Sequence, residues 1–324
     1  MNRRLLLVAA MAAIPLTALA QSSGKQWRIG YLSSGPRPAD GSVPAALRLG
    51  LAELGYAEGR NLQFEARWAH GDAKRLPALA QELVASRVNA VVAVGFPPAA
   101  AMRQATNGVP VVLVSAGDAV ESGLVRSLGH PGGNITGLSD MSIDLAAKRV
   151  EVLKDAVPNA RRLAVLWNKD DRAMTLRFQQ IENAARALAL QVKALGVRDT
   201  ADFDAAFAAM SRERPDAMFV VSDVLTSGNR RRIIEYAAAN RIPTMYEFGS
   251  YVQDGGLIAY GPSIEDIFHR AAYYIDRLFK GSKASDLPME QPTRTYLYIN
   301  VATAKAMGLP LSQTMLFRAD KVIE

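Results

Sequence analysis

The polar side chains that could bind a small molecule follow the apolar, strand-like runs of this sequence. Hydroxyls at these positions can bind an anionic group, and carboxylates can bind an ammonium group. Aromatic side chains stand close by in the sequence and could cover a flat or apolar part of the same molecule. The candidate ligand-binding residues are Ser33, Ser34, Phe96, Pro97, Ser115, Asp118, Ser139, Asn168, Asp223, Tyr246, Glu247 and Tyr260.

Each of these polar residues also has a purely structural explanation. Ser, Asp and Asn at the end of a strand often cap the helix that follows, and Trp167, inside an apolar run, is predicted to belong to the core. Backbone amides of the helix after Gly95 would add a binding place for an anionic group. Because no single side chain defines the site, the strand ends must meet in one place to form it.

The sequence lacks the motifs of the common catalytic and cofactor-binding sites. No strand-like run is followed by the glycine pattern of a dinucleotide site, and neither G-x-x-x-x-G-K-[ST] nor G-x-S-x-G occurs. There is no cysteine, and His70, His130 and His269 lack the spacing of metal ligands. We therefore predict no catalytic residue, no metal, no cofactor and no enzymatic activity.

Alternating strand and helix patterns predict a parallel α/β sheet in the first half of the chain. The run at residues 109–114 is continuously apolar, which is typical of a parallel strand buried on both faces. A small, polar turn at residues 115–118 follows it, and ligands bind at such turns in open α/β sheets. The predicted strands are 28–33, 62–69, 90–94, 109–114 and 135–138, and the predicted helices are 44–54, 76–86 and 99–106.

The second half repeats this rhythm, which predicts a second doubly wound lobe. An amphipathic helix between residues 264 and 279 is ended by Gly281, and the alternating stretch 288–299 is predicted to be a strand. A last helix is expected after Asn300, and residues 316–324 are expected to be a surface tail. The other predicted strands are 163–167, 191–195, 217–221, 243–246 and 257–260, and the helices are 174–188, 201–212 and 229–239.

The first residues have the pattern of a secretory signal peptide. Arg3 and Arg4 precede an apolar run at 5–14, and the small residues at 18–20 form a cleavage site before Gln21. We predict a signal peptide at residues 1–20, export by the general secretory route rather than the twin-arginine route, and, because no cysteine follows, no lipid anchor. The alternative is an N-terminal helix of a cytosolic domain.

Length and charge agree with an exported protein of two domains. The chain has 324 residues, 49% of them hydrophobic and 21% charged, which is ordinary for a soluble globular protein. Removing Arg3 and Arg4 lowers the formal net charge from +7 to +5, and the surplus is spread out except at residues 230–232. That triplet is predicted to be a solvated helix face, with a docking patch as the alternative. Nucleic acid is not an expected partner.

Several segments together are similar to one protein family over nearly the whole mature chain. They resemble the ABC-transporter substrate-binding family that includes tryptophan/tyrosine-binding proteins. At residues 95–97 this chain has Gly-Phe-Pro where related members often carry Gly-Thr-Pro, so a ring replaces a hydroxyl. The segments that carry the resemblance are 28–33, 50–56, 75–80, 117–118, 131–139, 260–262, 287–293 and 299–308.

The resemblance implies a type I periplasmic binding protein. Its fold consists of two doubly wound, Rossmann-like lobes joined by a three-crossover hinge, which we expect near Met141, Gly255-Gly256 and Gly281-Ser282. The expected first lobe comprises residues 28–141 plus 257–281, and the expected second lobe comprises residues 142–256 plus 282–324.

The resemblance also implies a function. The protein would be the periplasmic solute-binding component of an ABC importer, a monomer that closes on a small molecule like a Venus flytrap. It would deliver this ligand to a permease and its ATPase in the inner membrane. An aromatic or other amino acid is the expected ligand, and an aromatic acid or other carboxylate is the alternative.

Three other functions are alternatives for a chain of this kind. One is a periplasmic sensing subunit that presents its ligand to a signalling receptor, and another is a secreted α/β enzyme. A sugar-responsive repressor shares the fold, but this chain has a signal peptide where the DNA-binding headpiece would be. For a binding protein, we expect Asp118→Ala and Tyr246→Ala to weaken ligand binding without unfolding the chain.

Overall fold

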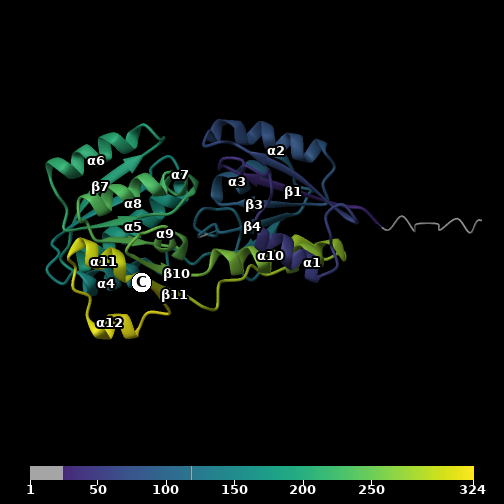
Figure 1. Cartoon of the computed structure of the whole chain (residues 1–324). Coiled ribbons are helices and arrows are strands. Elements are labelled where there is room, and N and C mark those ends of the chain that lie inside the picture. Colours follow the sequence, from purple (N-terminus) through teal and green to yellow (C-terminus); the bar gives the residue numbers. More distant parts are fainter. Residues whose placement is uncertain (1–24, 118) are drawn as a thin grey trace, which may run out of the picture.

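The protein consists of two α/β lobes that lie side by side (Figure 1). The structure is a computed structural model that describes residues 25–117 and 119–324. The predicted signal peptide and Asp118 lie outside the described residues. The predicted α/β class with two largely parallel sheets is confirmed, because one sheet of five strands and one of seven are present among the described residues.

The first lobe is built on a parallel sheet in the order β2-β1-β3-β4-β5. Its central strands are short and continuously apolar, because helices cover both faces. Ile29 stands opposite Ala90, and Val92 opposite Val112, so the carboxyl ends of these strands meet at one edge of the sheet. The strands are β1 (Trp27–Ser33), β2 (Leu62–Trp68), β3 (Ala90–Val94), β4 (Val111–Val114) and β5 (Ile135–Leu138).

Two pairs of helices cover the first sheet. The pair α2 and α3 buries one face, and the pair α1 and α10 buries the other. Helix α10 comes from late in the chain, and its apolar stripe, which includes Ile267, Ala271 and Ile275, packs on this lobe. The rings of Trp27 and Phe279 stack with centroids 4.0 Å apart. The helices are α1 (Ala45–Glu53), α2 (Leu76–Ala85), α3 (Phe96–Ala105) and α10 (Ile264–Phe279).

The second lobe is built on a sheet in the order β12-β11-β10-β9-β8-β6-β7. All neighbouring strands are parallel except β10 and β11, which are antiparallel. The strands are β6 (Arg162–Asn168), β7 (Gln191–Val197), β8 (Ala217–Val220), β9 (Thr244–Tyr246), β10 (Ile258–Gly261), β11 (Tyr296–Asn300) and β12 (Lys321–Ile323).

Helices also cover both faces of the second sheet. Helices α4, α5, α11 and α12 pack on one face, and α6, α8 and α9 pack on the other. They are α4 (Ala146–Ala156), α5 (Arg172–Ala187), α6 (Asp202–Arg212), α7 (Val224–Gly228), α8 (Arg230–Ala239), α9 (Gly249–Gln253), α11 (Val301–Met307) and α12 (Gln313–Phe317).

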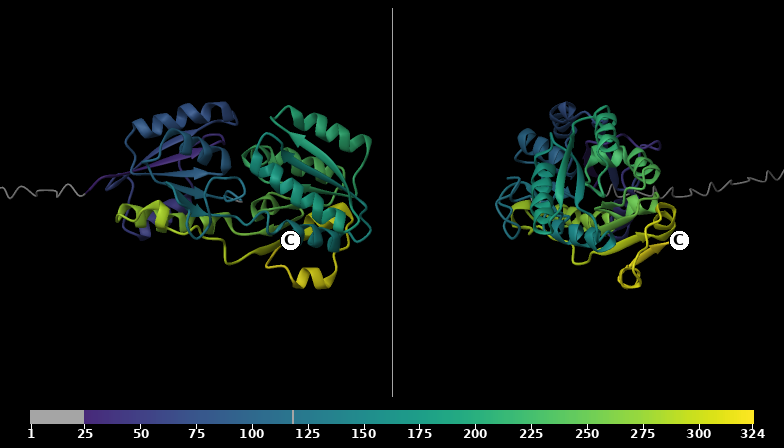
Figure 2. Two further views of the ribbon diagram at one scale, coloured as in Figure 1. Left: turned by 180° about the vertical axis from the view of Figure 1, so that it is seen from behind. Right: turned by 90° about the vertical axis from the view of Figure 1, so that its left-hand side faces the viewer.

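The chain passes between the lobes three times, and two of the expected boundaries are wrong. The strand expected to begin lobe one at residue 257 pairs with β9 and β11 of the second sheet, so the chain crosses at Pro262-Ser263 instead. It stays with the first lobe beyond residue 282, because Met289 lies in that core and the Glu290 N–H donates to the carbonyl of Gly137. The connections therefore lie at residues 139–145, 262–263 and 291–295, on one side of the molecule (Figure 2).

One further expectation near the C-terminus is wrong. The strand predicted at 288–299 begins only at Tyr296, because Pro288 and Pro292 lack the N–H that a strand ladder needs. The predicted tail does lie at the surface, and it also contains β12, whose Val322 stands opposite Ile299 of β11. Among the described residues, no helix is both long enough and apolar enough to cross a membrane.

We predict that Ile275→Ala destabilises the first lobe, because Ile275 of α10 is 0% exposed in its core. Removing a buried isoleucine side chain costs about 2–5 kcal/mol of unfolding free energy. Chemical denaturation measures this loss. The control is Arg277→Ala on the exposed face of the same helix, which should change stability by less than about 0.5 kcal/mol. Equal stabilities of the two variants would contradict the docking of α10.

Candidate ligand-binding site

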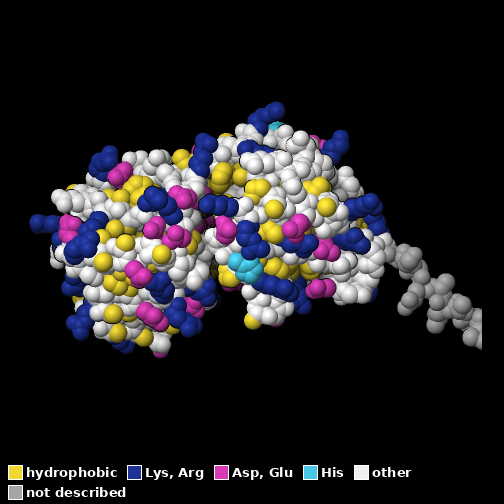
Figure 3. Space-filling view, turned by 90° about the horizontal axis from the view of Figure 1, so that it is seen from above, with side chains coloured by type: hydrophobic (Ala, Val, Ile, Leu, Met, Phe, Trp, Pro, Cys, Tyr) yellow, Lys and Arg dark blue, Asp and Glu magenta, His cyan; other side chains and the backbone are white. Residues whose placement is uncertain are grey.

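The loops at the carboxyl ends of the two sheets face each other where the lobes meet (Figure 2). The lobes touch at this junction. A Cβ atom added to Gly35, after β1, would lie 3.3 Å from Cγ1 of Val224 at the start of α7. Phe96 is half-buried and packs against the apolar cores of both lobes. Lys, Arg, Asp and Glu side chains of both lobes gather along the junction on the side opposite the connections (Figure 3). The predicted meeting of strand ends is therefore present.

The first lobe brings hydroxyl groups to the junction. The Ser33 hydroxyl accepts a hydrogen bond from the Gly35 N–H at 3.1 Å, which fixes the turn after β1. The Ser34 hydroxyl is buried and has no hydrogen-bond partner within the part of the chain that the structure describes. A buried hydroxyl without a partner is costly. Ser34 is therefore a donor available to a polar group between the lobes.

The start of α3 is a weaker anion site than the sequence suggested. Gly95 has φ +81°, the left-handed conformation that lets the chain turn from β3 into the helix. Pro97 and Pro98 follow in the first turn, and proline has no backbone N–H. The amide donors expected there are therefore reduced to that of Phe96. Pro97 shapes the turn rather than donating a hydrogen bond.

The second lobe brings two carboxylates to the junction. Asp223 caps α7, where its Oδ1 accepts from the Thr226 N–H at 2.8 Å, and its Oδ2 accepts from the Asn168 side-chain amide at 2.7 Å. Asp171 caps α5 by accepting from the Ala173 N–H at 2.8 Å. Neither carboxylate forms an ion pair with a Lys or Arg side chain among residues 25–117 and 119–324.

The surroundings of Asp171 disfavour its charged form. Asp171 is 5% exposed. Burial, followed by the nearby charge of Asp223, raises the pKa of Asp171 to about 6, although the capped backbone amides and Arg177 act in the opposite direction. This end of the second sheet is therefore a place of excess negative charge that a cation would relieve.

Behind the junction lies a buried network of two arginines and two carboxylates. Glu247, directly after β9, accepts from Arg149 of α4 at 3.0 Å and from Arg177 of α5 at 3.2 Å. Arg177 also donates to both carboxylate oxygens of Asp140, at 2.8 and 3.0 Å. Ser115 anchors Asp140 to the first lobe, because its hydroxyl donates to Asp140 Oδ2 at 3.0 Å. The network therefore joins the lobes.

The network contains two basic and two acidic side chains. Burial alone would raise the pKa of Asp140, but Arg177, the Ser142 N–H and Arg149 outweigh it and hold that pKa below its usual value. Burial lowers the pKa of Arg149, while Glu247 and Asp140 oppose this shift. Glu247 is therefore a partner of two buried guanidinium groups, 0% exposed, rather than an open ligand contact as expected.

Three other predicted residues have structural contacts of their own. Tyr246 is 0% exposed and stacks on Tyr251 in the core of the second lobe, so its replacement by alanine is expected to destabilise that lobe as well. The Tyr260 hydroxyl accepts from Thr295 in the last connection at 3.0 Å. The Ser139 hydroxyl accepts from the Met141 N–H at 3.0 Å and stabilises the first connection. Asp118, also predicted, lies outside the described residues.

Sequence reasoning missed the residues of this network and the second carboxylate. Asp140 and Asp171 follow strands closely, so the strand-end rule could have found them. Arg149 and Arg177 lie inside helices, where a charged residue is usually exposed, and nothing in the sequence marks them as buried. Among the described residues, no group of three or more His, Asp or Glu side chains could hold a metal ion.

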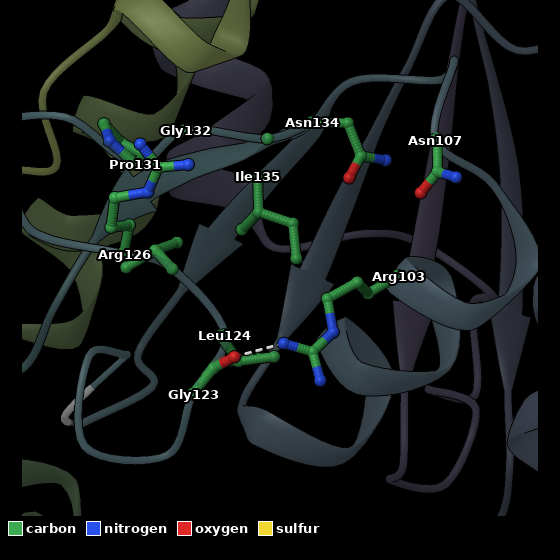
Figure 4. A pocket seen from close by; sticks show the side chains of 11 residues that line it. Arg103, Asn107, Gly123, Leu124, Arg126, Pro131, Gly132, Asn134 and Ile135 are labelled. Carbon is green, nitrogen blue, oxygen red and sulfur yellow. Dashed lines mark hydrogen bonds between the residues drawn. The ribbon is translucent and has the colours of Figure 1, made fainter.

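A separate surface pocket of about 470 Å³ lies on the first lobe (Figure 4). Arg103 and Asn107, at the end of α3, and Asn134, at the start of β5, line it. These elements place it at the edge opposite the strand carboxyl ends, away from the junction. Arg103 donates to the carbonyl of Gly123 across the pocket, so this guanidinium stabilises a loop.

We predict that replacing Asp171 with asparagine makes stability less dependent on pH. The pKa of about 6 in the folded state exceeds the unfolded value of about 4, so ionisation costs stability that is regained as the pH falls through 6. Asparagine cannot ionise and still caps the helix. The gain from Asp171→Asn should therefore be about 1 kcal/mol larger at pH 7 than at pH 5.

Urea denaturation at pH 5, 6 and 7 measures this difference. The control is Asp204→Asn on the exposed surface of α6, whose effect should not vary over this range. Parallel pH profiles of wild type and Asp171→Asn would show that Asp171 ionises normally.

Comparison with known proteins assigns the chain to a family. Residues 40–323 match the family described as ABC transporter substrate binding protein. The tyrosine-binding protein of Clostridioides difficile (strain R20291) is 26% identical over 288 residues, which cover 89% of this chain and 82% of that protein.

Solved structures share the two-lobed architecture. A conserved domain protein from Vibrio cholerae O1 biovar El Tor str. N16961 is 25% identical, with a TM-score of 0.86, 92% of this chain covered and 100% of that chain. An ABC domain in complex with L-Trp from Streptococcus pneumonia is 24% identical, with a TM-score of 0.85 and the same coverage. The predicted type I periplasmic binding protein fold is confirmed. The chain belongs to the ABC transporter substrate-binding protein family.

Proposed function

We propose that this protein is the periplasmic solute-binding component of an ABC importer and that its ligand is an aromatic amino acid. The observation that carries this proposal is the pair of neighbouring carboxylates, Asp171 and Asp223, at the junction between the lobes, neither of which forms an ion pair with Lys or Arg among the described residues. A ligand ammonium group would balance this charge. The tyrosine-binding relative and the L-Trp complex support the same class of ligand.

The ammonium group of the ligand would lie beside Asp223. This carboxylate is half-buried, and two of its three protein donors, the Thr226 N–H and hydroxyl, hold Oδ1 in the capping turn. A carboxylate can accept about four hydrogen bonds, so Asp223 can accept one more, from the ligand ammonium group. Asn168 fixes the orientation of Oδ2 from the neighbouring strand end.

The other parts of an amino acid find complementary groups in the first lobe. The unpartnered Ser34 hydroxyl and the Phe96 N–H can donate to the ligand carboxylate, in line with the hydroxyls predicted at the strand ends. The ring of Phe96, which contacts both lobes, can pack against an aromatic side chain. A ligand held this way bridges the lobes and favours their closed arrangement.

The rest of the proposal follows from the family. The mature protein, released from residues 1–20, would act in the periplasm as a monomer without a lipid anchor or enzymatic activity. It would pass its ligand to a permease and an ATPase in the inner membrane. The unneutralised carboxylates and the hydroxyl-lined first lobe fit binding and release and require no chemical step.

We predict that L-tryptophan or L-tyrosine stabilises the refolded, ligand-free protein against thermal unfolding. At about one hundred times its dissociation constant, a ligand that binds only the folded state adds about 2.7 kcal/mol. Indole-3-propionate, which lacks the ammonium group, is the matched probe and should give a much smaller shift. Equal shifts with L-tryptophan and indole-3-propionate would rule out the carboxylates as the ammonium site, and no shift with any aromatic amino acid would rule out the ligand class.

We also predict that Asp223→Asn weakens binding of the active amino acid by roughly ten- to a hundredfold, because a hydrogen bond to a charged group contributes about 1.5–3 kcal/mol. Isothermal titration calorimetry measures this change. Asp204→Asn on the outer surface of the same lobe is the control and should bind like wild type. Unchanged affinity of Asp223→Asn would place the ammonium group elsewhere.

A further inference from the structure

Gly117 of the first lobe and Arg177 of the second lobe lie in close contact across the junction. Gly117 lies in the turn after β4, and Arg177 lies in α5. A Cβ atom built on Gly117 would lie 2.4 Å from Nη2, 2.8 Å from Nε and 2.9 Å from Cζ of Arg177. The guanidinium group therefore rests directly against the backbone of the opposite lobe.

The guanidinium group of Arg177 cannot readily move away from this contact. Its Nη1 donates to Glu247 at 3.2 Å and to the carbonyl of Ser222 at 3.4 Å, and both acceptors belong to the second lobe. Its Nη2 donates to both oxygens of Asp140, which the first lobe holds through Ser115. The side chain is 1% exposed, so breaking these bonds would leave buried charges without partners.

The backbone around Asp140 shows that this contact is a constrained part of the structure. Ser115 and Met141 both have φ +53°, a left-handed conformation that is uncommon for residues with a side chain. Ser115 donates to Asp140, and Met141 follows it in the connection between the lobes. Local strain of this kind persists only where surrounding contacts determine the conformation.

We propose that Arg177, Asp140 and Gly117 form a latch that sets how far the lobes close and how strongly the closed arrangement is favoured. Asp140 attracts the guanidinium group across the junction, and Gly117, which has no side chain, lets it reach Asp140. The three residues would act on ligand affinity through the population of the closed state. They are positioning residues, because all three are buried and engaged with protein groups.

The latch rests on the proposed function, since a closed state matters only for a protein that binds between its lobes. Apparent affinity falls in proportion to the fraction of molecules that can adopt the binding-competent arrangement. A methyl group at Gly117 would push Arg177 from Asp140 when the lobes are arranged as in this structure. In an open state the opposite lobe has moved away, so the same methyl group meets no obstacle there. Gly117 has an ordinary φ, and alanine fits its backbone.

The experiment measures the separation of the lobes without and with ligand. The chain has no cysteine, so Ala78→Cys on the exposed face of α2 and Ala208→Cys on the exposed face of α6 can be spin-labelled uniquely. These helices lie at the same side of the two lobes, flanking the junction (Figure 1). Distances between the labels are compared in the doubly labelled protein, in its Gly117→Ala variant and in its Gly133→Ala variant. A Cβ on Gly133 would meet nothing within 4 Å, which makes this the matched control.

We expect Gly117→Ala to shift the ligand-free distances toward wider separations and to weaken binding of L-tryptophan or L-tyrosine about tenfold or more. Gly133→Ala should match the parent in both measurements. Asp140→Asn, which keeps the shape but removes the charge of the pair, should shift the distances in the same direction as Gly117→Ala. Thermal unfolding without ligand shows that each variant is folded.

Identical distance distributions of parent and Gly117→Ala, in a folded protein, would overturn the latch. This result is independent of the ligand, because the ligand-free distances alone decide it. Failure of the parent protein to bind aromatic amino acids would instead overturn the proposed ligand class and leave the distance test intact.

Discussion

The contact on which the two-lobed structure depends is the buried pairing of Arg177 with Glu247 and Asp140. Two charges of each sign are brought out of water here, since Arg149 completes the network. Such a group adds little net stability, because desolvation offsets most of the attraction. The network nevertheless constrains the positions of its members, because each guanidinium group donates its hydrogen bonds in fixed directions. The network thereby fixes the ends of β8 and β9, two helices and the first connection relative to one another.

Most of the fold was predictable from local patterns, and the exceptions share one cause. Continuous apolar runs such as 90–94 identified the parallel strands, and the apolar stripe of α10 identified a packed helix. The lobe to which β10 belongs was not predictable, because its pairing with β9 and β11 depends on residues far along the chain. The stretch 288–299 alternates like a strand, but its first part crosses between lobes as an extended segment. The periodicity of a strand is visible in a short segment of sequence, but the strand with which it pairs is not.

The sequence indicated which strand ends lie at the candidate site, but it did not indicate what each side chain does there. In parallel strands the carboxyl ends share an edge, and Ser33, Ser115, Asn168 and Asp223 lie at these ends. Strand β9 is buried on both faces, so its sequence could not show that Tyr246 points into the core. Glu247 shows a related difficulty. An acid after a strand can be a ligand contact or a structural partner, and only the buried arginines from distant helices distinguish the two.

The two lobes differ in what they can contribute to recognition. The second lobe carries the fixed charge, because Asp171 and Asp223 stand side by side while its arginines are occupied in the buried network. The first lobe has its strand-end carboxylate, Asp140, occupied by Arg177 and has lost two helix amides to Pro97 and Pro98. It offers a hydroxyl and the ring of Phe96 instead. If the second lobe selects the ligand by its charge, the first lobe selects it by its shape. A change at Phe96 would then alter which ligand side chains fit while leaving the proposed ammonium site unchanged.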